Sequence, residues 1–214
     1  MVHVYVTDIR RLPDPKEHPA ALCRVSSSRR RKVMKYTRAD DRRRCLGAGI
    51  LLAGILPLYG ENPENLTYGP EGKPQAENVH FNLSHSGHLV ICAVGRKAVG
   101  CDIEKTAEEP EGVAERFFHR NEAAYLQKFR GQERNEMFYR LWTWKESYVK
   151  MTGEGLMLPL RDFEILPEGE RIRVRRGGKI LPCYLTEYDI PEYQISVCTE
   201  EEESDRCVKY INPL

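Results

Sequence analysis

Apolar residues occupy every second position at the start of the chain, and this period of two predicts a β-strand over residues 2–6. From residue 26 to residue 59 the spacing becomes helical. Serines at the start of this stretch supply an N-cap, a basic run follows, and the apolar positions end at Pro57, which predicts two helices. Residues 61–78 are rich in Gly, Pro and Asn and predict a long surface loop.

Three short β-rich runs follow the loop, at residues 79–83, 88–94 and 98–104. The second and third are separated only by Gly-Arg-Lys at residues 95–97, which favours a hairpin between them and a meander overall.

The second half of the chain repeats this order of elements without repeating the sequence. Its pattern predicts helices at 113–118, 121–129 and 133–151, then strands at 162–166, 171–175, 179–188 and 193–199, then a solvated acidic terminus at 200–203. We therefore expect an α+β protein with two similarly built lobes, residues 1–104 and residues 105–214.

Charge and hydropathy narrow the classes of protein that fit. The chain has 214 residues with 33 Lys plus Arg and 32 Asp plus Glu, a net charge of +1, which excludes a polycation that coats nucleic acid and a polyanionic tail protein. The longest apolar stretch, residues 46–59, is interrupted by Gly and Pro and is too short to span a bilayer. The first residues lack the pattern of a secretory signal, so we expect a cytoplasmic protein without a membrane partner.

Cysteine usage predicts neither disulfides nor a zinc site. The seven cysteines are scattered, mostly flanked by apolar residues, and contain no C-x-x-C pair. Buried reduced thiols that act as small hydrophobic side chains are the expected role.

Two carboxylates, Asp102 and Glu104, lie two apart at the end of a predicted strand, so both project from one face. Mg²⁺ is typically held by one or two carboxylates together with substrate phosphates, and this pair suits such a site. The alternative is an ordinary strand end with solvated acids, which D-x-E alone would favour.

The predicted helix 133–151 carries a second constellation. Trp142, Glu146 and Lys150 are spaced i, i+4 and i+8 and share one face. The carboxylate suits a third metal ligand or a general base, and the ammonium suits neutralisation of charge on a transferred phosphate. The alternative is a simple surface pair of Glu146 and Lys150, worth only tenths of a kcal/mol.

Two further segments suit anion binding. Ser84 and His85 are neighbours on an extended chain and so point to opposite faces, which argues against a nucleophilic pair and for hydrogen bonding to a phosphate; a capped strand end is the alternative. A basic cluster suits an anionic ligand or a solvated helix face, and Tyr36 is its only interleaved aromatic residue, which weakens a nucleic-acid function. Its members are Arg29, Arg30, Arg31, Lys32, Lys35, Arg38, Arg42, Arg43 and Arg44.

Five motifs taken in order resemble the 4′-phosphopantetheinyl transferases of the surfactin-synthetase-activating (Sfp-like) type. They are Gly72-Lys73-Pro74, Phe81-Asn82-Leu83-Ser84-His85-Ser86, Gly100-Cys101-Asp102-Ile103-Glu104, Arg116-Phe117-Phe118 and Trp142-Thr143-Trp144-Lys145-Glu146-Ser147. The resemblance implies a pseudo-dimer of two α/β lobes with the active site at their interface. The length suits that type rather than the half-length, trimeric holo-acyl-carrier-protein synthases, and implies a monomer.

The resemblance also implies an activity and its residues. The expected reaction moves the phosphopantetheine arm of coenzyme A to a serine of an acyl or peptidyl carrier protein and releases 3′,5′-ADP. By resemblance Asp102, Glu104 and Glu146 hold Mg²⁺, or Mn²⁺ in its place. Glu146 is the implied general base and Lys150 balances charge on the bridging or leaving oxygen.

Coenzyme A contacts follow from the same resemblance. The implied residues are Arg31, Arg43, Lys73, Pro74, Ser84, His85, Lys145 and Lys150. The sequence departs from the family at Ser28, where a lysine is expected, and this departure shifts the implied phosphate contact to Arg29 or Arg30. The first lobe is thus expected to hold the nucleotide and the second to dock an acidic helical carrier.

Two other classes of function compete with the transferase. A metal-dependent phosphodiesterase or nuclease would use the same acids and lysines, but Lys105 follows Glu104 directly instead of in an E-x-K spacing. A non-catalytic adaptor for carrier proteins or nucleic acid would use only the basic cluster and leaves the three acids without a role.

Overall fold

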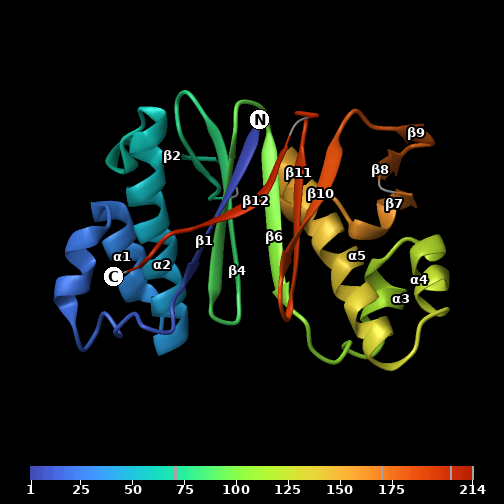
Figure 1. The fold of residues 1–214 in the computed structure, drawn as a ribbon, viewed down its shortest axis with the longest axis horizontal. Helices are drawn as coiled ribbons and strands as arrows, with labels where there is room; N and C mark the ends of the chain where they lie inside the picture. The colour runs from blue at the N-terminus through green and yellow to red at the C-terminus, as the bar shows by residue number, and fades with distance from the viewer. Residues whose placement is uncertain (70–71, 170, 203, 214) are drawn as a thin grey trace.

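The computed structural model describes residues 1–69, 72–169, 171–202 and 204–213 (Figure 1). The first half contains β1 (Val2–Asp8), α1 (Ser27–Lys35), α2 (Ala39–Ile55), β2 (Thr67–Tyr68), β3 (Pro74–Gln75), β4 (His80–Ser86), β5 (Leu89–Gly95) and β6 (Val99–Lys105), with 3₁₀ turns η1 (Pro19–Arg24), η2 (Leu56–Tyr59) and η3 (Pro63–Asn65). The second half contains α3 (Val113–Phe117), α4 (Arg120–Leu126), α5 (Gly131–Thr152), η4 (Gly155–Met157), η5 (Leu160–Asp162), β7 (Phe163–Glu168), β8 (Arg171–Arg176), β9 (Lys179–Ile180), β10 (Tyr184–Ile190), β11 (Tyr193–Thr199) and β12 (Ser204–Tyr210).

Two sheets face each other in the middle of the molecule, and each has a helix on its outer side (Figure 1). The strand orders are β12-β1-β5-β4 and β10-β11-β6. One apolar cluster lies between the sheets, and includes Val4 and Ile91 from the first and Ile103 and Val197 from the second. Two further clusters join α2 to the first sheet and α5 to the second. The predicted α+β architecture of two lobes is confirmed.

Strands β4 and β6 meet where the two sheets come together, and polar side chains join them. Asn82 Oδ1 accepts a hydrogen bond from the Cys101 amide at 2.9 Å. Ser86 Oγ donates to Glu104 at 2.7 Å and accepts from the Lys105 amide at 3.0 Å. This seam carries the end of β6, with its two carboxylates, to the boundary between the lobes.

Most predicted elements are confirmed, with their ends shifted by a few residues. Ser26 caps α1 by accepting a hydrogen bond from the Arg29 amide, and α5 ends at Gly153, whose φ of 74° is a left-handed conformation that glycine tolerates well. The loop predicted at 61–78 also contains β2 and β3, and its residues 70 and 71 lie outside the described residues.

The hairpin predicted between the second and third β-rich runs is wrong. Strand β5 pairs with β1 on one side and β4 on the other, so neither of its edges is available to β6, which pairs with β11 instead. Glu201 accepts hydrogen bonds from the amides of Arg96 and Lys97 between these strands, at 2.6 and 3.1 Å. The turn therefore carries the chain from one sheet to the other.

The acidic stretch predicted as a solvated terminus is exposed at Glu200 and Glu202, but Glu201 is partly buried and the stretch does not end the chain; Glu203 lies outside the described residues. Glu201 also pairs with the N-terminal ammonium, and the chain continues into β12, which pairs in parallel with β1. The division at residue 104 therefore fails for the last strand, which returns to the first sheet. The strand predicted at 179–188 is divided into β9 and β10, which belong to different sheets.

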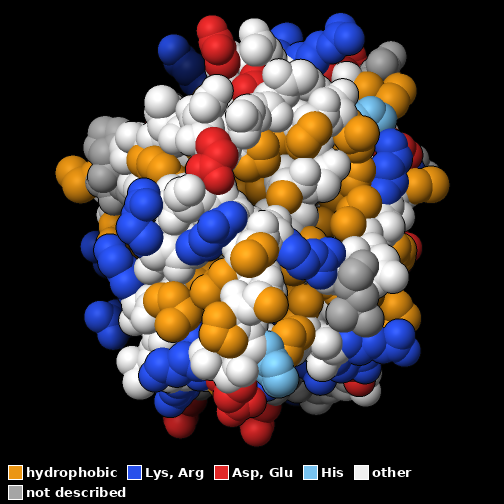
Figure 2. Space-filling model, turned by 90° about the vertical axis from the view of Figure 1, so that its left-hand side faces the viewer, with side chains coloured by type: hydrophobic (Ala, Val, Ile, Leu, Met, Phe, Trp, Pro, Cys, Tyr) orange, Lys and Arg blue, Asp and Glu red, His pale blue; other side chains and the backbone are white. Residues whose placement is uncertain are grey.

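The outer side of the first lobe carries many of the basic residues. Figure 2 shows Lys and Arg side chains scattered among hydrophobic ones over this face. All seven cysteines are free thiols; five of them are buried, as predicted, whereas Cys23 and Cys207 are exposed. Among the described residues, no helix is long and apolar enough to cross a membrane.

Candidate active site

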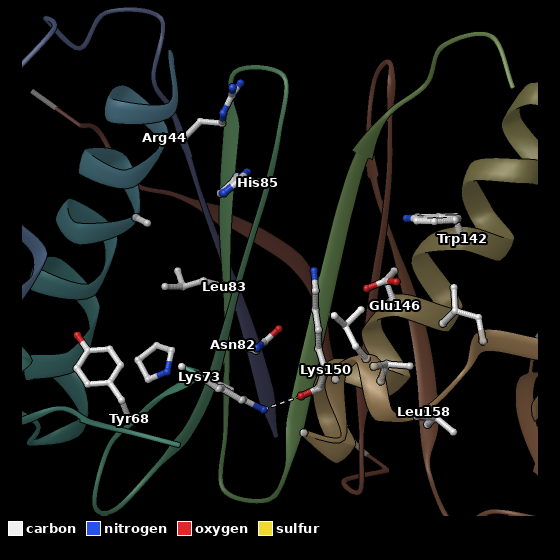
Figure 3. A pocket seen from close by; sticks show the side chains of 18 of the residues that line it. Arg44, Tyr68, Lys73, Asn82, Leu83, His85, Trp142, Glu146, Lys150 and Leu158 are labelled. Carbon is white, nitrogen blue, oxygen red and sulfur yellow. Dashed lines mark hydrogen bonds between the residues drawn. The ribbon is translucent and has the colours of Figure 1, made fainter. Parts of the chain in front are cut away.

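A cavity of about 1010 Å³ opens between α2 and α5, in front of the seam between β4 and β6 (Figure 3). This volume is at the upper end of the range for small-molecule sites. Its first-lobe end is basic and aromatic, and is lined by Arg29, Lys32, Tyr36, Arg44, Tyr68 and His85. Its second-lobe end is apolar with two arginines, and is lined by Arg116, Phe117, Trp142, Leu156, Leu158 and Arg161.

Gly100 sets the closeness of α5 to β6. A Cβ atom at this position would lie 2.1 Å from the Ser147 carbonyl oxygen and 2.2 Å from the Met151 amide nitrogen, both in the backbone of α5. Only glycine permits this approach without a shift of the helix. The contact brings Glu146 and Lys150 beside the strand that carries the two predicted metal ligands.

A partly buried ion pair lies at the centre of the site. Lys150 Nζ is 2.6 Å from Asp102 Oδ1 and 3.1 Å from Ser84 Oγ, and Ser84 Oγ donates to the same carboxylate oxygen at 2.7 Å. Burial opposes the charge of Lys150, but the Asp102 carboxylate outweighs it and raises the pKa of the lysine. Asp102 is only 2% exposed, and its other oxygen, Oδ2, is buried with no hydrogen-bond partner among the described residues.

Burial and a neighbouring carboxylate both disfavour the ionised form of the other two acids. Burial raises the pKa of Glu104 and of Glu146, and the charge of Asp102 raises both further. In the described parts of the chain, no three His, Cys, Asp or Glu side chains are already arranged to hold a metal ion. The donors nevertheless fit a hard divalent cation, because they are all carboxylate oxygens and the buried Asp102 Oδ2 is still free to accept.

Lys73 lines the cavity together with Pro74, but its ammonium is engaged. Lys73 Nζ donates to the carbonyl oxygen of Lys150 at 2.6 Å and to that of Val99 at 3.3 Å (Figure 3). Burial lowers its pKa. Lys73 therefore ties the loop before β4 to the last turn of α5, and in this arrangement its ammonium is not directed to a ligand phosphate.

The predicted contact of Lys145 with the pyrophosphate is wrong. Lys145 is fully buried, and its Nζ donates to Glu122 at 2.7 Å and to the Phe163 carbonyl at 2.9 Å. Burial lowers its pKa to about 8. Glu122 also accepts from the amides of Ile165 and His119, so this pair joins α4, α5 and β7 inside the second lobe.

Ser84 and His85 separate as their positions on an extended strand predict. His85 lines the cavity, and burial together with the Arg44 and Lys150 charges lowers its pKa. Ser84 is turned to the Asp102–Lys150 pair and is absent from the described cavity wall, so its predicted nucleotide contact does not agree with the structure.

In the described part of the chain, two of the basic residues expected to contact coenzyme A do not line the cavity. Among the described residues, neither Arg31 nor Arg43 lines the cavity, and Arg43 instead bonds Asp40 and the Leu12 carbonyl. Arg29, one of the two alternatives to Ser28, does line it, whereas Arg30 folds back onto the Val25 carbonyl.

Helical spacing could have identified Arg44, and not Arg43, as a residue of the cavity wall. Asp41, Arg44, Cys45 and Ala48 all line the cavity and are spaced i, i+3, i+4 and i+7 on α2, which is one face of a helix. Arg43 lies on a neighbouring face.

Comparisons with known proteins identify relatives of this chain. Residues 98–198 match the family model of the 4′-phosphopantetheinyl transferase superfamily. The chain is 37% identical over 182 residues to 4′-phosphopantetheinyl transferase ffp of Bacillus subtilis, covering 81% of each chain. It is 32% identical over 182 residues to 4′-phosphopantetheinyl transferase Sfp of B. subtilis strain 168, again covering 81% of each, and 33% identical to 4′-phosphopantetheinyl transferase gsp of Aneurinibacillus migulanus, covering 82% of this chain and 76% of the relative.

Solved structures give a more distant likeness. The holo-[acyl-carrier-protein] synthase of Thermotoga maritima is 19% identical with a TM-score of 0.40, covering 47% of this chain and 61% of that one.

Proposed function

Because this chain belongs to the 4′-phosphopantetheinyl transferases of the Sfp-like type, we propose that it transfers the 4′-phosphopantetheine arm of coenzyme A to a serine of an acyl or peptidyl carrier protein. The serine Oγ attacks the β-phosphorus, the bond from that phosphorus to the bridging oxygen breaks, and 3′,5′-ADP leaves. The observation that carries the proposal is the Lys150–Asp102–Ser84 cluster, of which Lys150 lines the cavity together with Glu146.

The first-lobe end of the cavity suits the nucleotide. Arg29, Lys32 and Arg44 supply cations there, His85 supplies a hydrogen-bonding ring, and Tyr36 and Tyr68 supply aromatic faces. A guanidinium offers a planar fork to a phosphate, and an aromatic face suits an adenine ring. We assign the 3′-phosphate to this end, and the arm to the apolar second-lobe end.

Glu146 and Lys150 are assigned to the reacting atoms. The raised pKa of Glu146 brings its carboxylate nearer to the basicity that proton removal from a serine requires. Lys150 remains protonated beside Asp102, and its charge balances the oxygen that departs with 3′,5′-ADP. Glu146 and Lys150 lie one helical turn apart on α5.

Asp102, Glu104 and Glu146 are the residues that would hold Mg²⁺ or Mn²⁺. When bound, such an ion neutralises the pyrophosphate charge and polarises the bond to be broken. The free Oδ2 of Asp102 and the raised pKa values of the two glutamates support this assignment. We also infer a monomer, since the elements on both sides of the cavity come from a single chain, and we keep the cytoplasmic location that the sequence predicts as part of this proposal.

The test is direct. An apo acyl carrier protein and an apo peptidyl carrier protein are incubated separately with coenzyme A, Mg²⁺ and the protein, and each carrier is weighed by mass spectrometry. The expected result is one phosphopantetheine added to the acceptor serine of at least one carrier, with stoichiometric 3′,5′-ADP. Cleavage of coenzyme A to 3′,5′-ADP without any modified carrier would favour a phosphodiesterase instead.

A further inference from the structure

Arg29 is a buried cation without a carboxylate partner. Its side chain is only 7% exposed, and no Asp or Glu among the described residues forms an ion pair with it. In the same part of the chain its guanidinium donates only to the Cys45 thiol, with 3.8 Å between Nη1 and Sγ. Buried charges in proteins are normally paired. An unpaired guanidinium on the cavity wall therefore indicates that its counter-ion is a group of the ligand.

A glycine of α2 makes room for this side chain. A Cβ atom at Gly49 would lie 2.6 Å from Cγ of Arg29 and 2.7 Å from Cγ1 of Val25, the residue just before the α1 cap. The Val25 Cβ would lie at 3.0 Å, and this atom cannot rotate aside. Any larger residue at position 49 would therefore push the start of α1, and Arg29 with it, away from α2.

The same side of α2 gives the guanidinium its direction. Cys45 lies one helical turn before Gly49 on α2. The Arg29 side chain has its Cγ beside Gly49 and its Nη1 beside Cys45, so it runs along α2 from one residue to the other. Cys45 lines the cavity, whereas Gly49 is not among the described residues of its wall. The side chain therefore leads from the packed interior of the first lobe to the cavity.

A second glycine of α2 is equally crowded but does not touch Arg29. A Cβ atom at Gly47 would lie 2.6 Å from Cγ2 of Ile9, and the next nearest atoms belong to Val90 and Leu12. All three of these side chains are apolar and buried or packed in the first lobe. The two glycines therefore combine similar crowding with different neighbours, and this difference makes Gly47 a matched control for Gly49.

We propose that Gly49 is a positioning residue for the nucleotide: it leaves the space through which the Arg29 guanidinium is directed at the 3′-phosphate of coenzyme A. The proposal rests on the proposed function, which assigns this phosphate to the first-lobe end of the cavity. Gly49 itself touches no ligand in this arrangement. Its effect is on the choice between coenzyme A and 3′-dephospho-coenzyme A, because only the former carries the group that Arg29 pairs with.

The experiment is calorimetric titration of the intact protein with each of these two ligands. Gly49→Ala should weaken coenzyme A binding about tenfold, as expected for the loss of one charge-assisted contact, and leave the affinity for 3′-dephospho-coenzyme A within about twofold of the wild type. Gly47→Ala should bind both ligands as the wild type does. In steady-state transfer, the KM of Gly49→Ala for coenzyme A should rise while kcat at saturating coenzyme A is retained.

A double-mutant cycle separates positioning from general packing. If Gly49 acts through Arg29, then Gly49→Ala should have no further effect on coenzyme A affinity in an Arg29→Ala background. The pair Val25→Ala with Gly49→Ala guards against a variant that does not fold, because it removes the Val25 contact and leaves Arg29 as the crowded side chain. This pair should also lose the preference for coenzyme A, whereas Val25→Ala alone should keep it.

Four results would overturn the proposal. They are equal affinity of the wild type for the two ligands, unchanged coenzyme A affinity in Gly49→Ala, an equal loss with both ligands in that variant, and an additive loss in the Arg29→Ala background. The third would make Gly49 a packing residue only. Failure of the proposed function has a different signature: the wild type would bind coenzyme A more tightly than its 3′-dephospho form and yet modify no carrier.

Discussion

Lys150 and Asp102 form a salt bridge of 2.6 Å between α5 and β6, in a site where the aspartate is only 2% exposed. The i, i+4 spacing of Glu146 and Lys150 suggested a weak surface pair, but the lysine instead pairs across to the neighbouring strand. Replacing one residue of a partly buried ion pair lowers the stability of the protein, because the remaining charge is left without a partner.

A double-mutant cycle should measure this pair. We expect Asp102→Asn and Lys150→Met each to lower the free energy of unfolding by about 1–3 kcal/mol, and the double variant to lose clearly less than the sum. Urea unfolding of the four proteins provides the measurement. Strict additivity would show that the two side chains do not interact in solution.

Replacement of Glu146 by Gln should separate catalysis from binding. The amide keeps the volume but removes the base and the charge, so single-turnover transfer should fall by about 10²-fold or more. Coenzyme A affinity in calorimetry should persist, since the cations of the first-lobe end are untouched. Undiminished transfer would remove Glu146 from the mechanism, and a parallel loss of affinity would make it a binding residue only.

The same variant should have a pH-dependent gain in stability. Burial raises the folded pKa of Glu146 above its unfolded value, so this carboxyl lowers stability as the pH rises past the unfolded pKa, and the loss is complete above the folded pKa. Glu146→Gln should therefore melt higher than the wild type at pH 7, and this advantage should shrink as the pH falls to 4, where the wild-type carboxyl is also neutral. Thermal scans between these values test the sign. A lower melting temperature at pH 7 would contradict it.

Metal dependence should follow from the three carboxylates. Chelation with EDTA should stop transfer, and Mg²⁺ or Mn²⁺ should restore it, because oxygen-only donors favour hard cations over Zn²⁺. Glu104→Gln should raise the Mg²⁺ concentration needed for half-maximal rate, whereas Glu108→Gln should not, because Glu108 is exposed while Glu104 is partly buried beside Asp102 and Glu146. Full turnover in EDTA, or equal Mg²⁺ requirements of the two variants, would count against this metal site.

Arg44 and Arg31 give opposite predictions about the nucleotide. Arg44 lines the cavity and Arg31 does not, although the family resemblance implied that Arg31 contacts coenzyme A. Arg44→Ala should weaken binding of coenzyme A about tenfold while leaving 3′-dephospho-coenzyme A unaffected, since one charge-assisted contact to the phosphate is lost. Arg31→Ala should bind both ligands as the wild type does. Calorimetry with the two ligands would expose an exchange of these roles.

The sequence predicted the positions of the side chains that we assign to the reaction better than those of the residues around them. Period-two and helical spacing located β6 and α5, and the spacing within each placed Asp102, Glu104, Glu146 and Lys150 correctly on their elements. The burial of Lys145 was not predictable in this way, because its partner Glu122 is 23 residues away on a separate helix. Local spacing carries no signal for a pair that only tertiary folding brings together.

Strand pairing was limited by the same lack of long-range information. The turn at 95–97 has hairpin composition, but β5 already has partners on both edges, and one of them, β1, lies nearly 90 residues earlier. Strand β12 also returns from the far end of the chain to pair with β1. Both strand pairings join residues that are far apart in the sequence, so local spacing does not predict them.

Gly100 provides the sharpest test of how α5 is positioned. A methyl group at this position would lie 2.1 Å from the Ser147 carbonyl oxygen, and the atoms in its way belong to backbone, which cannot rotate aside. Gly100→Ala should therefore lower the free energy of unfolding by about 3 kcal/mol or more, at or beyond the upper end of ordinary overpacking, and reduce transfer as Glu146 and Lys150 move. The matched control is Gly54→Ala in α2, where the nearest atom lies 4.0 Å away and alanine should add about 0.5–1 kcal/mol of stability. Urea unfolding of the two variants provides the comparison, and similar stability in both would show that α5 does not lie against β6 as closely as this geometry requires.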